Sequence, residues 1–187
     1  MTIVCDLDNT INNLHEAVVN LFNERHKTNY TINDFHDYSI ENNIPIKDAT
    51  AMKKMYNEDN IYNYVVPIPG ASDAIQKLIH MGHKVYIASD CTNSDYNEKR
   101  EWLNRFFPFI DNDHIVSIKH KHLLRADVMI EDNLLNLLSG THYHRICIDS
   151  PWNRDVHDYV YDIHRCQNWR QIVDVINKIE KEESEDN

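Results

Sequence analysis

Glycine is scarce in this chain of 187 residues, which carries it only at Gly70, Gly82 and Gly140. P-loops and GxGxxG dinucleotide-binding loops both need several glycines within a few residues, because their backbone must approach a phosphate closely. Neither loop can form here. If this protein binds phosphate, something other than a glycine-rich loop binds it.

Cysteines are also few and far apart, and Cys5, Cys91, Cys147 and Cys166 form no CxxC pair. A zinc ribbon or a thioredoxin-like site needs such a pair, so neither class of site fits. The twelve histidines include no HExxH zinc pattern. Reduced thiols are the simplest interpretation of these cysteines, and we expect a cytoplasmic protein.

Long apolar runs and positive charge are lacking as well. No apolar stretch approaches the length of a membrane span, and the N-terminus shows no basic-then-apolar leader. We therefore expect neither a secretion signal nor a membrane partner. The formal net charge of −11 would repel a polyanion, which argues against long nucleic acid as a partner. A small phosphorylated substrate is still compatible with this charge, because it needs only a local positive pocket.

The first ten residues carry the most informative pattern that is present. Residues 2–5 predict a short buried strand that runs directly into Asp6 and Asp8. Ligands of α/β folds bind at the carboxyl ends of strands, and strand alternation turns these two carboxylates to the same side. Carboxylates that close repel each other unless a cation or a proton lies between them, which favours a bound divalent metal. The alternative is that Asp8 or Asn9 only caps the following helix.

Further strands and helices alternate along the chain. Apolar periodicity and the positions of glycine and proline define them. The predicted strands cover residues 84–88, 114–118, 127–130, 145–149 and a short 159–161, and the predicted helices cover residues 14–27, 71–81, 95–107, 133–138 and 169–179. This alternation predicts an α/β fold, with a Rossmann-like and mostly parallel sheet sandwiched by helices.

The stretch 29–63 differs from the rest of the chain. It is polar, rich in Asn, Asp, Tyr and Lys, and only weakly periodic, which indicates a small helical insertion and not a part of the sheet. We therefore expect an insertion at this place, which the two prolines and the glycine of residues 67–70 close. Residues 181–187 are expected to be a disordered acidic tail.

Four of the predicted strands end in, or lead into, side chains that suit phosphoryl transfer. These side chains are Asp6 and Asp8, Ser89, Lys119 and Lys121, and Glu131 and Asp132. Carboxylates suit Mg²⁺, while a lysine and a hydroxyl suit phosphate oxygens. An aspartate can also attack phosphorus and form an aspartyl-phosphate. Each residue alone has an ordinary explanation, such as a helix cap or a solvated edge, so their joint occurrence in this order is the specific signal.

Several motifs along nearly the whole chain match those of one family. They are the strand ending in DxDxT at residues 6–10, the segment 67–71, Glu98 and Lys99 followed by Trp102 and the phenylalanines at 106 and 107, Lys121 six residues before Asp127 of the run 126–132, and the segment 150–154. In these motifs the chain resembles the haloacid dehalogenase superfamily of phosphatases, and within it the 5'(3')-deoxyribonucleotidases. The resemblance implies a Rossmann-like catalytic core at residues 1–13 and 67–180, with a helical cap at residues 14–66 inserted after the first strand.

The resemblance also implies roles in chemistry and metal binding. Asp6 would be the nucleophile and a metal ligand. Asp8 would be the general acid for the leaving nucleoside oxygen and then the base for hydrolysis, with its backbone carbonyl on the metal. Asp132, alone or with Glu131, would complete the Mg²⁺ site.

Phosphate binding would fall to Ser89 and Lys121, with Lys99 as a further contact. Two residues depart from the family pattern. Asn9 stands where many superfamily members have glycine, which is tolerable because Asn also adopts the left-handed conformation. Asp90 stands where the nucleotidases tend to have a small polar residue, and its carboxylate would repel the substrate if it pointed inward.

These expectations predict an Mg²⁺-dependent phosphomonoesterase that dephosphorylates deoxyribonucleoside monophosphates through an aspartyl-phosphate. Tyr56, Tyr62 and Tyr64 of the cap could stack on a base or simply pack the cap. Two other functions stay open: a phosphatase of the same superfamily acting on a non-nucleotide small phosphoester, and a non-catalytic binding protein on that fold. The cap could support a homodimer, although no residue argues for one.

Overall fold

The computed structural model describes residues 1–57, 60–91, 95–156 and 158–185. Its centre is a six-stranded parallel sheet in the order β3-β2-β1-β4-β5-β6. The strands are β1 (Thr2–Asp6), β2 (Lys84–Ser89), β3 (Ile115–Ser117), β4 (Val128–Glu131), β5 (His144–Ile148) and β6 (Ile163–Cys166). The predicted α/β, Rossmann-like fold is confirmed.

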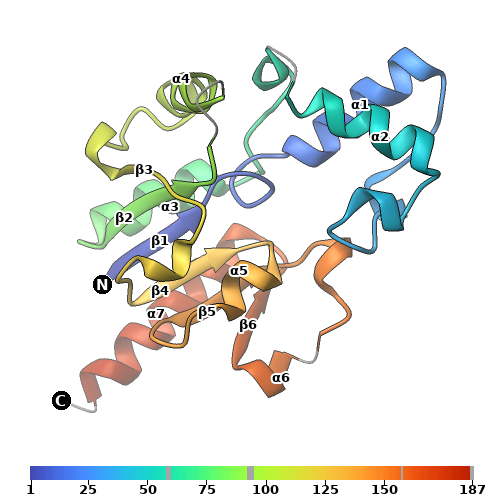
Figure 1. Cartoon of the computed structure of the whole chain (residues 1–187). Coiled ribbons are helices and arrows are strands. Elements are labelled where there is room, and N and C mark those ends of the chain that lie inside the picture. The colour runs from blue at the N-terminus through green and yellow to red at the C-terminus, as the bar shows by residue number, and fades with distance from the viewer. Residues whose placement is uncertain (58–59, 92–94, 157, 186–187) are drawn as a thin grey trace.

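Seven α-helices surround or extend this sheet in the described part of the chain (Figure 1). They are α1 (Leu14–His26), α2 (Ile46–Met55), α3 (Ala71–His80), α4 (Tyr96–Phe106), α5 (Leu134–Leu138), α6 (Asp158–Tyr161) and α7 (Trp169–Glu185). Helices α3 and α7 contact each other, whereas α5 packs on β4 and β5. Helices therefore cover both faces of the sheet, as the crossover connections of a parallel sheet require.

Side chains of the strands alternate between two buried clusters. Ile3, Ile87, Ile130 and Ile146 belong to one cluster with the inward residues of α3 and α7. Val4, Ala88, Met129 and Cys147 belong to a second cluster with Leu137 of α5. Because both faces are buried, these strands are nearly continuous apolar runs, and this is why the sequence shows them clearly.

The strand order changes direction between β1 and β4. From β1 the chain adds β2 and β3 on one side, and it then crosses to add β4, β5 and β6 on the other. In open α/β sheets, ligands bind outside the carboxyl ends of the strands at such a switch point. Asp6 at the end of β1 and Glu131 at the end of β4 therefore lie at the expected ligand position.

The segment between β1 and α3 carries α1, α2 and three short 3-10 turns, and α1 packs against α2 to one side of the sheet (Figure 1). An antiparallel bridge between Asn12 and Pro67 brings the entry and the exit of this segment together. The helical character agrees with the sequence pattern. The exact division into a core and a cap at residues 14–66 stays a prediction.

The predicted short strand at residues 159–161 is wrong. Those residues belong to helix α6, and the sixth strand is β6, four residues later. Val160 and Tyr161 have β-forming side chains, but they are 58% and 46% exposed, so no core contact favours a strand there. The real strand, β6, was missed because its two central residues are polar. One of them, Arg165, forms ion pairs with Asp149 and Asp158.

The predicted disordered tail is also wrong for residues 181–185. Helix α7 continues through Glu185. Lys178 lies 3.6 Å from Glu182, and Lys181 lies 3.7 Å from Glu185. Such i,i+4 pairs stabilise an exposed helix end, which a charge run alone does not reveal. The last two residues of the predicted tail lie outside the described residues.

Two other expectations can be compared directly. All four cysteines are free, as the reduced-thiol interpretation requires. None of the helices in the described ranges combines the length and the apolar character needed to cross a bilayer.

Candidate active site

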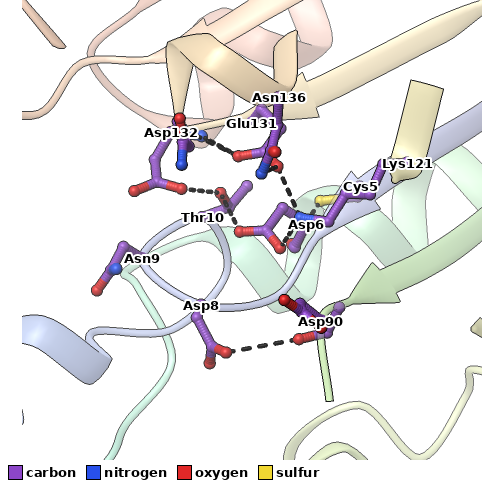
Figure 2. Close-up of polar contacts among 12 residues, drawn as sticks. Cys5, Asp6, Asp8, Asn9, Thr10, Asp90, Lys121, Glu131, Asp132 and Asn136 are labelled. Atoms are coloured by element: carbon purple, nitrogen blue, oxygen red, sulfur yellow. Dashed lines mark hydrogen bonds and ion pairs between the residues drawn. The ribbon is translucent and has the colours of Figure 1, made fainter. Parts of the chain in front are cut away.

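A cavity of about 310 Å³ opens at the carboxyl ends of β1, β2 and β4. Its lining includes Asp6, Asp8, Ser89, Lys121 and Asp132. Figure 2 shows Asp6, Glu131 and Asp132 converging with Lys121 from the ends of β1 and β4 and from the turn before β4. Lys99 is not part of the lining, but it lies directly behind Ser89, with its Nζ atom 3.0 Å from the serine hydroxyl. The structure thus brings the sequence-predicted residues together.

The loop after β1 is a tight turn that folds back on its own aspartates. Asn9 adopts the left-handed conformation, with a φ of 62°. This agrees with the expectation that asparagine can take the place of the usual glycine at this position. The turn returns the Thr10 hydroxyl to 3.2 Å from Asp6 Oδ2 and the Asn12 amide to 2.9 Å from Asp8 Oδ1. Asn9 Oδ1 and Asn12 Oδ1 accept from the first backbone N–H groups of α1, those of His15 and Leu14, so Asp8 is not used as a helix cap and lines the cavity.

Asp8 is held by groups from three separate parts of the chain. Its Oδ1 accepts from Asn12 and from the Tyr62 hydroxyl, and Lys99 Nζ lies 2.9 Å from its Oδ2. Tyr62 is buried and packs edge-on against Trp102, so it is not free to stack on a base. Its hydroxyl instead fixes Asp8, a contact that the sequence did not predict.

Lys121 bridges the ends of β1 and β4. Its Nζ donates to Asp6 Oδ1 and lies 2.6 Å from Glu131 Oε1, and all three side chains are buried. Burial alone would lower the pKa of Lys121, but the carboxylates of Asp6 and Glu131 outweigh it and raise that pKa above its usual range. Lys121 therefore stays charged.

Glu131 is fully committed to holding this corner of the site. One oxygen accepts from Lys121 and from the Asn136 amide at 2.8 Å. The other accepts from the backbone N–H groups of Asp132 and Asn133, at 3.0 and 2.9 Å. These four contacts use the acceptor capacity of a carboxylate. Glu131 thus anchors Lys121, and Asp132 is the better candidate for a metal ligand.

The residues present fit a divalent cation. Oxygen atoms of Asp6, Glu131 and Asp132 lie within 4.8 Å of one another, and Lys121 gives this buried group one positive charge. Burial raises the pKa of both Asp6 and Asp132, and repulsion from Glu131 raises both further. Three buried carboxylates with one lysine are short of positive charge, and hard oxygen ligands are those that Mg²⁺ prefers.

The end of β2 supplies a hydroxyl, and α4 supplies a second cation next to it. Lys99 of α4 is buried and lies next to Ser89, and it also donates to the main-chain carbonyl of Asp90 at 2.8 Å. Asp90 is exposed and lines the cavity. An effect of its negative charge on the choice of substrate stays a prediction. Whether Lys99 reaches a phosphate also stays a prediction.

A second cavity of about 260 Å³ adjoins the first and shares Tyr38 with it. Its lining includes Tyr56, His15 and Trp152. Among the tyrosines predicted to stack or pack, Tyr56 faces this cavity, whereas Tyr64 is 54% exposed elsewhere. Tyr38 was missed as a candidate, because the sequence gives no sign that it approaches the end of β1. Trp152 lies in the segment 150–154 that the family resemblance singled out, but no role was predicted for it.

His15 of α1 is buried beside this second cavity and should make folding sensitive to acid. Its Nδ1 pairs with the Tyr56 hydroxyl, while its Nε2 has no hydrogen-bond partner within the described ranges. Burial lowers the pKa of His15 from 6.5 to about 4. Between these values the unfolded chain binds the proton and the folded protein does not, so the contribution of His15 to stability falls as the pH drops from 6.5 to 4.

We expect this histidine to cost about 3 kcal/mol of unfolding free energy between pH 7 and pH 4. Replacing His15 with glutamine removes the titrating group, so the variant should lose less stability over that range than the wild type. Urea unfolding at several pH values measures the difference. The exposed His80, changed to glutamine, is the matched control and should keep the wild-type slope. Equal slopes for all three proteins would refute the assignment.

Comparison with known proteins adds a family match. The family described as 5' nucleotidase, deoxy (pyrimidine), cytosolic type C protein matches residues 1–182. The chain is 27% identical over 168 residues to the 5'(3')-deoxyribonucleotidase of Clostridium acetobutylicum, covering 90% of each chain. It is 26% identical over 183 residues to a putative 5'(3')-deoxyribonucleotidase of Staphylococcus epidermidis, covering 96% of this chain and 97% of that one.

Solved structures show the same fold at low sequence identity. A haloacid dehalogenase-like hydrolase from Streptococcus pneumoniae superposes with a TM-score of 0.64 at 13% identity, covering 94% of this chain and 97% of that chain. A predicted phosphatase from Clostridium acetobutylicum gives a TM-score of 0.63 at 12% identity, covering 95% and 98%. The sheet and its helices therefore have the haloacid dehalogenase-like arrangement that the motifs implied.

Proposed function

This chain belongs to the family of 5' nucleotidase, deoxy (pyrimidine), cytosolic type C proteins, and we propose that it removes the phosphate from deoxyribonucleoside monophosphates. Family membership makes it a phosphoric monoester hydrolase. The observation that carries the proposal is the meeting of Asp6, Lys121 and Asp132 in one cavity at the switch point of the sheet. We also propose a cytoplasmic location, which the free cysteines support.

Asp6 would act as the nucleophile. One of its carboxylate oxygens would form a bond to phosphorus while the bond from phosphorus to the nucleoside oxygen breaks, leaving an aspartyl-phosphate. Asp8 would give a proton to the departing nucleoside oxygen. Asp8 would then take a proton from a water that attacks phosphorus, which releases inorganic phosphate and restores Asp6. The contacts from Asn12 and Tyr62 support this role, because they fix the position of Asp8.

Phosphate binding would use Ser89 at the end of β2 and two lysines, Lys121 in the turn before β4 and Lys99 in α4. Lys121 already contacts Asp6, so it would lie beside a phosphate that Asp6 attacks and would offset the repulsion between the two anions. Ser89 lines the same cavity, and Lys99 supports it from behind. Lys99 also pairs with Asp8, so an arriving phosphate would compete with Asp8 for this lysine.

Asp6, Asp132 and the backbone carbonyl of Asp8 would hold Mg²⁺ in this proposal. When bound, Mg²⁺ would supply positive charge to the phosphoryl oxygens and so favour displacement at phosphorus. The shortage of positive charge among the buried carboxylates supports a cation at this place. The nucleoside would extend toward the adjoining cavity, where Tyr38, Tyr56 and Trp152 offer aromatic walls.

The test is phosphate release from deoxy- and ribonucleoside 5'- and 3'-monophosphates, alongside sugar phosphates, with Mg²⁺ and with EDTA. We expect Mg²⁺-dependent release that prefers deoxyribonucleotides and stops in EDTA. Release only from non-nucleotide esters would keep the aspartate chemistry and would make the cap and Asp90 the first places to test for a different specificity. Metal binding without release from any ester would favour a binding protein. The homodimer stays a prediction that sedimentation can test.

A further inference from the structure

Trp152 contacts a carboxylate of the candidate metal site. Its indole Nε1 donates to Asp132 Oδ2 at 3.0 Å. Trp152 lies in a 3-10 turn, η6 (Pro151–Asn153), that follows β5, whereas Asp132 follows β4. The other oxygen of Asp132 points toward the Thr10 hydroxyl at 3.5 Å (Figure 2). A hydrogen bond of 3.5 Å is weak, so Oδ1 can still accept another strong contact, whereas Oδ2 is occupied by the indole N–H.

The turn that carries Trp152 is fixed against the same residue. Ser150 and Asn153 form a reciprocal capping box that closes the turn. The Asn153 amide donates to the backbone carbonyl of Asp132 at 2.8 Å. Arg165 of β6 in turn donates to the side chain and, at 2.8 Å, to the backbone carbonyl of Asn153. Trp152 is therefore held in place from β6 on one side and from the end of β4 on the other.

We propose that Trp152 is a positioning residue for the metal site. Its indole N–H holds the Asp132 carboxylate by Oδ2 and so leaves Oδ1 free for a cation. This inference rests on the proposed function, since it takes Asp132 as a ligand of Mg²⁺. Asp132 is 2% exposed, so water cannot replace a missing donor easily. Hydrogen bonds from outside the ligand set orient metal-binding carboxylates, and their loss typically weakens metal affinity or activity by about 10–100-fold.

A purely packing role for Trp152 makes a different prediction. The ring lines the second cavity, and its centroid lies 5.2 Å from that of His15, so the tryptophan also has ordinary ring contacts. Phenylalanine or tyrosine at this position keeps an aromatic body but has no N–H at the indole position. If Trp152 only packs, these variants should change substrate affinity or stability and should leave metal affinity as it is.

The experiment compares wild type, Trp152→Phe and Trp152→Tyr. Binding of Mn²⁺ to nucleotide-free protein is measured by electron paramagnetic resonance of the free ion, and the Mg²⁺ concentration for half-maximal phosphate release is measured separately. Trp102→Phe is the matched control, because it loses an indole bond of 2.9 Å to the carbonyl of Val65 and touches no carboxylate of the site. Thermal unfolding without metal shows that each variant is folded.

Both Trp152 variants should bind Mn²⁺ about 10-fold more weakly or worse, with the Mg²⁺ requirement raised by a similar factor. The rate at saturating Mg²⁺ should stay within about 3-fold of wild type, and the control should match wild-type metal affinity. Unchanged Mn²⁺ affinity in folded Trp152 variants would overturn the inference while leaving the proposed function intact. If the wild type binds Mn²⁺ but releases no phosphate, the proposed function is overturned. The Mn²⁺ titration of the Trp152 variants still decides the role of Trp152 in that case. A wild type that binds no Mn²⁺ would overturn both.

Discussion

Replacing Asp6 with asparagine is expected to lower the rate of phosphate release by a factor on the order of 10⁴. Asparagine has nearly the same shape, but its amide is a poor nucleophile and carries no negative charge. The covalent step then has no attacking group, whatever the binding of substrate. Phosphate release at saturating deoxyribonucleotide and Mg²⁺ measures the loss. An active Asp6→Asn protein would rule out the aspartyl-phosphate mechanism.

The same change should not unfold the protein. Burial and the neighbouring carboxylates raise the pKa of Asp6, which means that its ionised form is held in the folded state at a cost. Asparagine removes one negative charge from a group that has too many, so the free energy of unfolding should stay the same or rise. Asp73→Asn on the exposed face of α3 is the control and should leave both rate and stability unchanged. A gain in stability with loss of activity would identify Asp6 as a residue selected for chemistry.

Local sequence pattern was sufficient for the strands β1 to β5 and for their ends, but not for the polar edge strand β6. The central strands are apolar on both faces, and each ends where the chain changes abruptly to polar residues, as at Asp6 and Ser89. Parallel pairing then brings those ends together without further information. Lys121 needed more than pattern, because it lies in a 3-10 turn between β3 and β4, and the spacing to the fourth strand in the family resemblance identified it.

The contacts that complete the site were not predictable from pattern. Tyr62 and Asp8 are separated by 54 residues, and Trp152 and Asp132 by 20 residues. Each pair depends on how a separate segment folds over the sheet, and an aromatic residue in a polar stretch suggests packing as readily as hydrogen bonding. Glu131 shows the reverse case. Its place beside Asp132 suggested a metal ligand, but only the three-dimensional contacts show that its oxygens are already occupied.

Replacing Lys121 with methionine is expected to have the second large effect, on both activity and stability. The value of kcat/KM for a deoxyribonucleotide should fall by a factor on the order of 10³, because the phosphate would approach Asp6 without the cation that offsets their repulsion. Removing one partner of a buried ion pair also leaves Asp6 and Glu131 uncompensated, which costs about 3–5 kcal/mol of unfolding free energy. Phosphate release and urea unfolding at pH 7 measure the two losses.

The pH dependence of the stability loss separates charge from packing. Without Lys121, the buried carboxylates hold their protons more tightly in the folded state than in the unfolded chain. The folded variant then gains stability relative to the wild type as the pH falls from 7 toward 4.

Adding Glu131→Gln should restore part of the stability at pH 7 and none of the activity, since it removes an unpaired charge but supplies no cation. Lys84→Met at the opposite end of β2 is the control and should behave as wild type. A Lys121→Met protein that is equally destabilised at all pH values would show that methionine fits the site poorly, and one with wild-type kcat/KM would remove Lys121 from the phosphate site.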